Sequence, residues 1–220
     1  MTIEQEPKVK EILSEEARQK KSRIYDISED NLNFKEKAGK YIDFLNANAY
    51  DKERDVRTNI AGEFQKSNLA AALQTAELIC GRLDEDKIYE ALSQIRISGR
   101  MEEIAPGIIV DVSHNIQGMQ GFVQTVEANY HGMKKRILFA ASHQNEEEYM
   151  KNILKTIPEI EAFYTVGIHK RRIDEAEFQD AFRKMIDRNQ ETTVCFVVGS
   201  FYLAGMAKEF INQEEENVRL

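Results

Sequence analysis

Short apolar runs alternate with longer amphipathic segments throughout the second half of this chain. The predicted strands are residues 108–111, 136–141, 161–166 and 193–199, and the predicted helices are residues 116–130, 146–157, 174–187 and 201–212. Parallel strands need a crossover segment between them, and strands that are buried on both faces are apolar along their whole length. The alternation therefore predicts an α/β domain with a mostly parallel sheet covered by helices on both faces.

The first half of the chain is less regular. Residues 8–21 and 66–80 show apolar side chains at helical spacing, Gly81 would end the second of these helices, and Asp84 would cap a third. The predicted strands of this half are residues 24–27, 41–50 and 56–60, with a polar turn at residues 51–54. These elements do not make a convincing domain by themselves, and we place a domain boundary near Ser98.

Composition limits the class of protein. Hydrophobic residues make up 42% of the 220 residues, which is enough for a sizeable core, and the net charge of −8 argues against a nucleic-acid partner. No apolar run is long enough to span a membrane, and the acidic, polar first residues do not fit a secretory signal. We therefore expect a cytoplasmic protein in which Cys80 and Cys195 are buried free thiols. The spacing of Cys and His predicts no metal site.

Residues 98–115 contain the most informative polar groups. A Gly-Arg pair at residues 99–100 leads into a hairpin-like stretch, and an apolar strand then ends at Asp111. His114 and Asn115 follow, just before an amphipathic helix. Open α/β sheets bind ligands outside the carboxyl ends of their strands, so we expect the functional site here.

Four segments carry a resemblance to known enzymes. They read Gly-Glu-Phe-Gln-Lys-Ser-Asn at 62–68, Ser-Gly-Arg-Met-Glu at 98–102, Asp-Val-Ser-His-Asn-Ile at 111–116 and Val-Gly-Ser-Phe-Tyr-Leu at 198–203. They are similar, in order, to Gly-x-His-Gln-x-x-Asn, Pro-Gly-Arg-Met/Leu-Glu, Asp-Gly-Ala-His-Asn-Pro and Thr-Gly-Ser-Leu-Tyr-Leu of the folylpolyglutamate synthases, which belong to the Mur ligase superfamily. The resemblance covers most of the chain.

The resemblance implies a domain organisation. Residues 98–220 would form the Rossmann-like carboxy-terminal domain of a Mur ligase, and residues 1–97 would be the tail of its central ATPase domain. The family's phosphate-binding loop, Gly-Thr-x-Gly-Lys-Gly-Ser, does not occur in this sequence, whose only Gly-Lys pair, at residues 39–40, precedes Tyr41. We therefore expect either the carboxy-terminal part of a longer enzyme or a truncated relative that does not hydrolyse ATP by itself.

The resemblance also implies a reaction. In this family ATP, with Mg²⁺, phosphorylates the γ-carboxyl of a folate's terminal glutamate, and the amine of an incoming L-glutamate attacks the acyl phosphate. The expected partners are folate polyglutamate and L-glutamate, and either a separate half that carries the phosphate-binding loop or a second copy of this chain. We expect the chain to be inactive alone. The alternative is a diverged, non-catalytic module that acts in binding or subunit association.

Two residues are expected to bind ATP if the resemblance extends to function. Arg100 would donate to ATP phosphate through its planar guanidinium, and Asn68 would contact the adenine. The alternative for Arg100 is a surface ion pair with Glu102 or Glu103, and the alternative for Asn68 is an exposed position on a helix.

Four further residues are expected at the reacting groups. The resemblance places Asp111 and His114 near the phosphate and the incoming glutamate, where His114 would orient or deprotonate the amine. Asn115 and Ser200 would bind substrate. The alternative is that Asp111 or Ser113 caps the following helix, and that Ser200 caps the last one.

The chain also departs from the family's motifs. Val112 and Ser113 replace Gly-Ala in the central motif, which adds bulk near the turn. A basic run at residues 170–172 faces either a polyglutamate tail or solvent. A dinucleotide-binding domain is not predicted, because no Gly-x-Gly-x-x-Gly follows a strand.

Overall fold

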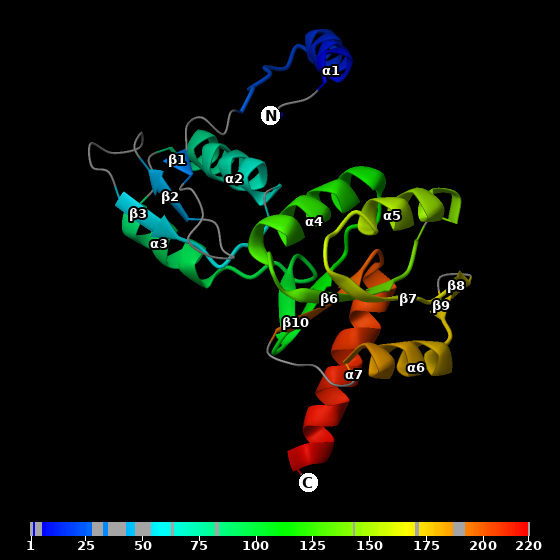
Figure 1. Ribbon diagram of the computed structural model, residues 1–220. Coiled ribbons are helices and arrows are strands. Elements are labelled where there is room, and N and C mark those ends of the chain that lie inside the picture. Colours follow the sequence, from blue (N-terminus) through cyan, green and yellow to red (C-terminus); the bar gives the residue numbers. More distant parts are fainter. Residues whose placement is uncertain are drawn as a thin grey trace. The chain divides into compact units, whose positions relative to one another are not determined.

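The computed structural model contains two compact units, Met1–Ile95 and Arg96–Leu220, which we describe separately (Figure 1). The residues that the structure describes are 2, 6–27, 33–34, 43–46, 54–62, 64–81, 84–142, 144–169, 172–186 and 192–219. None of the helices within these ranges is long and apolar enough to cross a membrane.

The first unit combines three helices with a small antiparallel sheet. The helices are α1 (Pro7–Gln19), α2 (Gln65–Cys80) and α3 (Glu85–Gln94), and the strands, in sheet order, are β1 (Asn33–Phe34), β2 (Asp43–Asn46) and β3 (Arg54–Arg57). Gly81 ends α2 with a φ of +73°, and the Asp84 carboxylate caps α3 by accepting from the Lys87 N–H. Ile27, Ile60, Leu69, Ala70 and Leu92 form the core of this unit.

The helices predicted for the first unit are confirmed, but its strands differ from the prediction. Only a single bridge, from Thr2 to Asp26, occurs where a strand was predicted at 24–27. β3 begins at Arg54, inside the predicted turn, and ends before Thr58, whose hydroxyl accepts from the Ile60 N–H at 3.2 Å and so makes a local turn. Residues 51–53 of the predicted turn lie outside the described residues.

The prediction of buried thiols is correct for one cysteine only. Cys195 lies in a central strand and is buried, and burial raises the pKa of its thiol to about 11. Cys80 is exposed, because it ends α2 in a last turn where Leu78 and Ile79 are exposed as well. The apolar residues that precede Cys80 in sequence suggested that its side chain would be buried, but they are exposed themselves.

The second unit is built on a five-stranded sheet. In spatial order the strands are β4 (Glu102–Ala105), β5 (Ile108–Asp111), β10 (Thr193–Val198), β6 (Lys134–Phe139) and β7 (Ile160–Thr165). β4 is antiparallel to β5, and the other neighbouring strands are parallel. The predicted α/β fold with a mostly parallel sheet is therefore confirmed, as is the hairpin-like stretch after Arg100.

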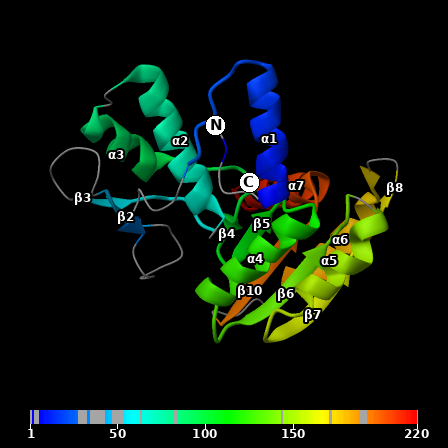
Figure 2. The ribbon, with the colours of Figure 1, turned by 90° about the horizontal axis from the view of Figure 1, so that it is seen from above.

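Helices cover both faces of this sheet, as predicted. α4 (Ile116–Asn129) and α5 (Glu147–Leu154) lie on one face, and α6 (Glu175–Ile186) and α7 (Phe201–Arg219) lie on the other (Figures 1 and 2). Phe122 of α4 packs against Phe196 of β10, with ring centroids 5.5 Å apart. On the opposite face Phe182 of α6 packs against Phe210 of α7 at 5.1 Å.

Three short elements of the second unit were not predicted, nor was β1 of the first unit. They are the 3₁₀ turn Gln144–Glu146 and the paired strands β8 (Ile168–His169) and β9 (Arg172–Ile173). The predicted basic run falls at this hairpin, where Arg172 is exposed in β9, and residues 170–171 lie outside the described residues.

The strand order places a topological switch point at the carboxyl ends of β5 and β10. β5 and β10 are parallel neighbours, yet the chain leaves β5 for α4 on one face and leaves β10 for α7 on the other. Ligands bind at such switch points in open α/β sheets. Gly199 makes the turn after β10 possible, because its φ is +107° and a Cβ there would lie 2.4 Å from the Ala140 carbonyl oxygen.

Candidate active site

The structure places five of the six predicted site residues at this edge of the second unit. Arg100 lies in the loop before β4, which starts beside the end of β5. Asp111 ends β5, His114 and Asn115 lead into α4, and Ser200 lies between β10 and α7. Asn68 belongs to α2 in the first unit, where it is exposed and donates to Gln65 Oε1 at 2.8 Å.

Asp111 is completely buried and both of its oxygens accept backbone hydrogen bonds. Oδ2 accepts from the Met101 N–H at 3.0 Å, and Oδ1 accepts from the Ser113 N–H at 2.8 Å. Burial raises the pKa of Asp111, although the two N–H donors and the nearby Arg100 charge act in the opposite direction. The carboxylate therefore joins the loop that carries Arg100 to the loop that carries His114, which favours a positioning role over contact with substrate.

The backbone around Arg100 is tightly constrained. Gly99 has a φ of +71°, and a Cβ there would lie 2.7 Å from Cγ1 of Val112. The Gly99 carbonyl accepts from the Val112 N–H at 2.8 Å, and Met101 also has a left-handed φ, of +46°. Val112 is buried in the core, so the bulk that it adds to the family's Gly position is directed into the protein.

His114 is held in a defined orientation. Its Nδ1 lies 3.0 Å from the Val112 carbonyl oxygen, which can only accept, so Nδ1 carries a proton and Nε2 is the acceptor nitrogen of the neutral ring. The ring also contacts Phe201 of α7, with centroids 5.5 Å apart. An oriented imidazole with an acceptor Nε2 is suited to receive a proton.

Asn115, not Asp111 or Ser113, caps α4. Its Oδ1 accepts from the Gly118 N–H at 2.7 Å, while the Asp111 oxygens are taken up by Met101 and Ser113. The predicted alternative that Asp111 or Ser113 is the cap is therefore wrong. The Ser113 hydroxyl is buried close to the Asp111 carboxyl and favours its charged form, but it makes no geometrically good hydrogen bond to the described residues.

Ser200 makes the cap-type bond that was the alternative to substrate binding. It is buried, and its Oγ accepts from the Tyr202 N–H in the first turn of α7 at 3.1 Å. Capping and ligand contact are compatible, because the first turn of a helix presents N–H donors that favour an anion.

Two contributors to this edge were not predicted from the sequence: Phe201 of α7, which contacts His114, and Lys208 of α7, which pairs with Glu102. Phe201 stands where the family motif has Leu, and this difference is the signal in the sequence that could have indicated it.

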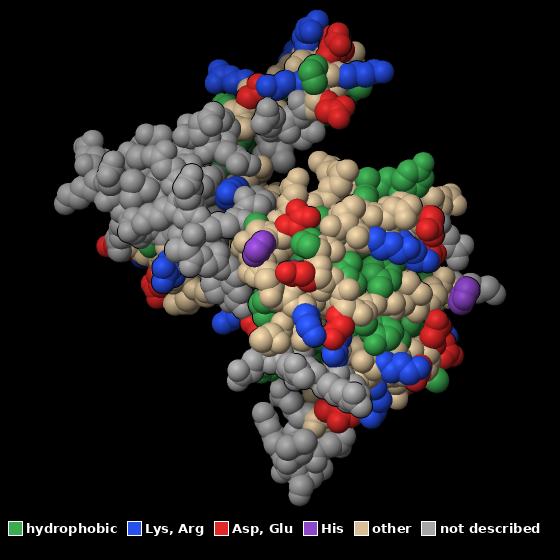
Figure 3. All heavy atoms as spheres, in the orientation of Figure 1, with side chains coloured by type: hydrophobic (Ala, Val, Ile, Leu, Met, Phe, Trp, Pro, Cys, Tyr) green, Lys and Arg blue, Asp and Glu red, His purple; other side chains and the backbone are tan. Residues whose placement is uncertain are grey.

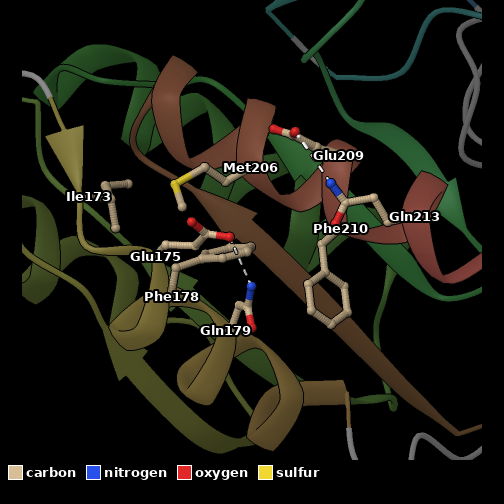
Figure 4. Close-up of a pocket in the computed structure, with 8 residues that line it drawn as sticks. All are labelled: Ile173, Glu175, Phe178, Gln179, Met206, Glu209, Phe210 and Gln213. Atoms are coloured by element: carbon tan, nitrogen blue, oxygen red, sulfur yellow. Dashed lines mark hydrogen bonds between the residues drawn. The ribbon is translucent and has the colours of Figure 1, made fainter.

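A groove of about 230 Å³ between α6 and α7, away from the predicted site residues, was not predicted either (Figure 4). Its lining residues are Ile173, Glu175, Phe178, Gln179, Met206, Glu209, Phe210 and Gln213.

The described residues do not include a cluster of three or more His, Cys, Asp or Glu side chains that would hold a metal ion.

Known proteins resemble this chain in structure and not in sequence. No protein-family model matches the chain, and no curated protein matches it in sequence. Solved structures do match. The apo form of Lactobacillus casei folylpolyglutamate synthase has a TM-score of 0.75 at 17% identity, over 96% of this chain and 52% of that one. The Thermotoga maritima folylpolyglutamate synthase has a TM-score of 0.69 at 21% identity, over 96% and 53%.

The fold is that of part of a folylpolyglutamate synthase. A third structure, E. coli FolC in complex with ADP, agrees, with a TM-score of 0.73 at 14% identity over 93% of this chain and 51% of that one. Another matching structure is a complex of the synthase with AMPPCP and folate. The chain thus spans about half the length of these structures, and the predicted resemblance is confirmed at the level of the fold.

Proposed function

We propose that this chain is the carboxy-terminal portion of a folylpolyglutamate synthase-like ligase, which adds L-glutamate to the γ-carboxyl of a folate or folate polyglutamate with ATP. The observation that carries the proposal is the arrangement of Arg100 and His114 on adjacent loops at the switch point of a sheet with this fold. In this proposal residues 98–220 are the Rossmann-like carboxy-terminal domain, and residues 1–97 are the tail of the central ATPase domain.

Arg100 would act on the phosphoryl group. Formation and attack of an acyl phosphate both develop negative charge on phosphoryl and carbonyl oxygens. A guanidinium presented by a pinned loop meets that charge without first having to reorganise, which is what electrostatic stabilisation of a transition state requires. Asp111 supports this by holding the backbone of the loop through Met101.

His114 would act on the incoming L-glutamate. The ammonium group of that substrate must lose a proton before its nitrogen can attack, and Nε2 is the acceptor atom of the oriented ring. Asn115 and Ser200 begin α4 and α7 on opposite faces of the sheet at the switch point, where the substrate's carboxylates would meet helix N-termini.

The proposed site is completed by residues outside this sequence. ATP would be held by a phosphate-binding loop of another chain or segment, with Asn68 contacting the adenine. The chain alone is accordingly expected not to turn over, and folate polyglutamate, L-glutamate and a half that carries the phosphate-binding loop are its proposed partners.

The experiment measures phosphate release that depends on ATP and L-glutamate, with a tetrahydrofolate substrate. It compares the chain alone with the chain mixed with a separately expressed phosphate-loop half. We expect activity only in the mixture, and its loss in His114→Ala. His131→Ala, an exposed histidine that precedes β6 at the other end of the sheet, is the matched control and should stay active. Equal activity of both variants would contradict the role of His114.

An exposed apolar stripe favours the second candidate, a non-catalytic module for subunit association. α1 contains no buried residue, and Val9, Ile12 and Leu13 are 39%, 62% and 38% exposed among charged side chains (Figure 3). A stripe of this kind is suited to packing against another helix. Silence in the phosphate assay, with association of the two halves confirmed by sedimentation, would support this candidate over the ligase.

A further inference from the structure

The loop that carries Arg100 is held from the last helix as well as from β5. Lys208, on α7, reaches back to this loop, where its Nζ donates to Ser98 Oγ at 2.7 Å and pairs with the Glu102 carboxylate at 2.5 Å. Ser98 and Glu102 stand on either side of Arg100, so one ammonium group connects both ends of the loop.

Glu102 extends this connection to the backbone. Its Oε2 accepts from the Gly99 N–H at 2.6 Å in addition to the ion pair with Lys208. Partial burial by itself would raise the pKa of Glu102, but the bonds from Lys208 and Gly99 hold it below its usual range. The carboxylate is therefore charged at neutral pH and remains a strong acceptor for both donors.

The loop needs such support because its backbone is unfavourable by itself. Gly99 and Met101, the residues on both sides of Arg100, have left-handed φ angles, and Met101 bears a side chain in that region. Such conformations persist only where surrounding contacts impose them. Asp111 supplies one such contact at Met101, and Lys208 supplies the other through Ser98 and Glu102.

Helix α7 also contacts His114, the second candidate residue of the site. Phe201 packs against the His114 ring, and Lys208 follows Phe201 by about two helical turns, on the same face of α7. Leu203, Ala204 and Ala207 of α7 are buried in the core between these two positions, which makes α7 a rigid support.

We propose that Lys208 is a positioning residue, which fixes the loop that carries Arg100 so that the guanidinium and the His114 ring are set relative to each other by a single helix. The inference rests on the proposed function in one respect, the binding of phosphate by Arg100. The geometry of the loop does not depend on that function.

Amide hydrogen exchange, followed residue by residue by NMR, tests the effect on the loop. We expect Lys208→Met to speed exchange at Gly99 and Val112 roughly ten-fold, because the bonds of both amides depend on the held loop. Lys208→Arg retains a cation and should restore most of the protection. Lys184→Met removes an exposed ion pair with Asp180 on α6 and should change neither amide. Unchanged exchange in Lys208→Met would overturn the inference.

Titration with Mg-ATP in the mixture with the half that carries the phosphate-binding loop, read from the backbone amides of residues 98–102 of this chain, tests the link to function. We expect Arg100→Met to weaken binding most and Lys208→Met to weaken it several-fold, with recovery in Lys208→Arg. Lys208→Met should have no further effect once Arg100 is replaced, because both act through one group.

The outcomes separate the two claims. Unchanged affinity in Arg100→Met would defeat the proposed phosphate contact, and the exchange measurement would then decide the role of Lys208 by itself. Weakened binding in Arg100→Met with full affinity in Lys208→Met would overturn the inference and leave the proposed function standing.

Discussion

Two charged side chains are completely buried at opposite ends of the same sheet, and they are accommodated in different ways. Asp111 ends β5 at the carboxyl edge and is held by backbone N–H groups of Met101 and Ser113. Lys135 lies near the start of β6, at the amino edge, and its Nζ donates to the carboxylate of Glu159 at 2.7 Å.

The way in which each buried charge is bound indicates the role of that edge of the sheet. At the amino edge a countercharge neutralises Lys135, and the pair fixes a turn in which Glu159 has a left-handed φ of +64°. At the carboxyl edge Asp111 instead accepts hydrogen bonds from the backbone of two loops, those that carry Arg100 and His114. A buried charge needs either hydrogen-bond donors or a countercharge, and the two ends of this sheet use one each.

The largest expected effect is the loss of stability on removing Asp111. Asp111→Ala leaves two buried N–H donors without acceptors, and we expect the free energy of unfolding to fall by about 4 kcal/mol. Asp174→Ala is the control, because that carboxylate accepts from the Glu177 N–H at an exposed helix start, where the loss should be about 1 kcal/mol. Urea unfolding measures both. Equal losses would mean that Asp111 does not organise the two loops.

A smaller expected effect is the pH dependence of stability, which should differ between Asp111 at the carboxyl edge of the sheet and Glu159 at the amino edge. Burial raises the pKa of Asp111 above its ordinary 3.8, so the folded state retains the proton, and this group's contribution to stability declines as pH rises above that value. The bond from Lys135 lowers the pKa of Glu159 below 4.5, so its contribution is present above that pH and is lost as pH falls.

The two substitutions should therefore have opposite pH dependences. Between about pH 3.5 and pH 6, the cost of Asp111→Asn should shrink as pH rises, and the cost of Glu159→Gln should grow. Urea unfolding of both variants and the wild type across this range measures the slopes. Slopes of the same sign would show that the two charges are accommodated alike.

The smallest expected effect concerns Phe201. Its side chain is 59% exposed, so Phe201→Leu, which introduces the residue of the similar synthase motif, should change the free energy of unfolding by less than about 0.5 kcal/mol. The ring resonances of His114 should nevertheless shift in NMR spectra, because the aromatic contact is lost. Tyr149→Leu, another exposed aromatic substitution, should leave those resonances in place. Identical His114 spectra in both variants would exclude Phe201 as an orienting contact.

The sequence was sufficient for the features that depend on local periodicity. Apolar runs and helical stripes predicted the parallel strands and the helices of the second unit, because burial on a given face forces a given spacing of side chains. The placement of Asp111, His114 and Ser200 at strand ends followed from the same elements. Two-residue strands such as β8 and β9 are too short to produce a periodic signal.

The sequence was insufficient for features that depend on distant partners. The alternative role of Asp111 as a helix cap was allowed by its neighbours in sequence, but its partner Met101 lies ten residues earlier in the hairpin. Lys208 is 110 residues from Ser98 and belongs to no motif, so only the packing of α7 beside β4 reveals the contact. The exposed end of α2 at Cys80 likewise depends on which faces the fold covers.

The position of β10 has a consequence for how the second unit is made. This last strand lies between β5 and β6, so neither of them has its full set of hydrogen-bonding neighbours until residues 193–198 have left the ribosome. Until then both strands present unpaired edges, which are templates for association with other chains. About 85 residues are therefore synthesised between the start of β5 and the central strand, and association with other chains competes with correct folding during that interval.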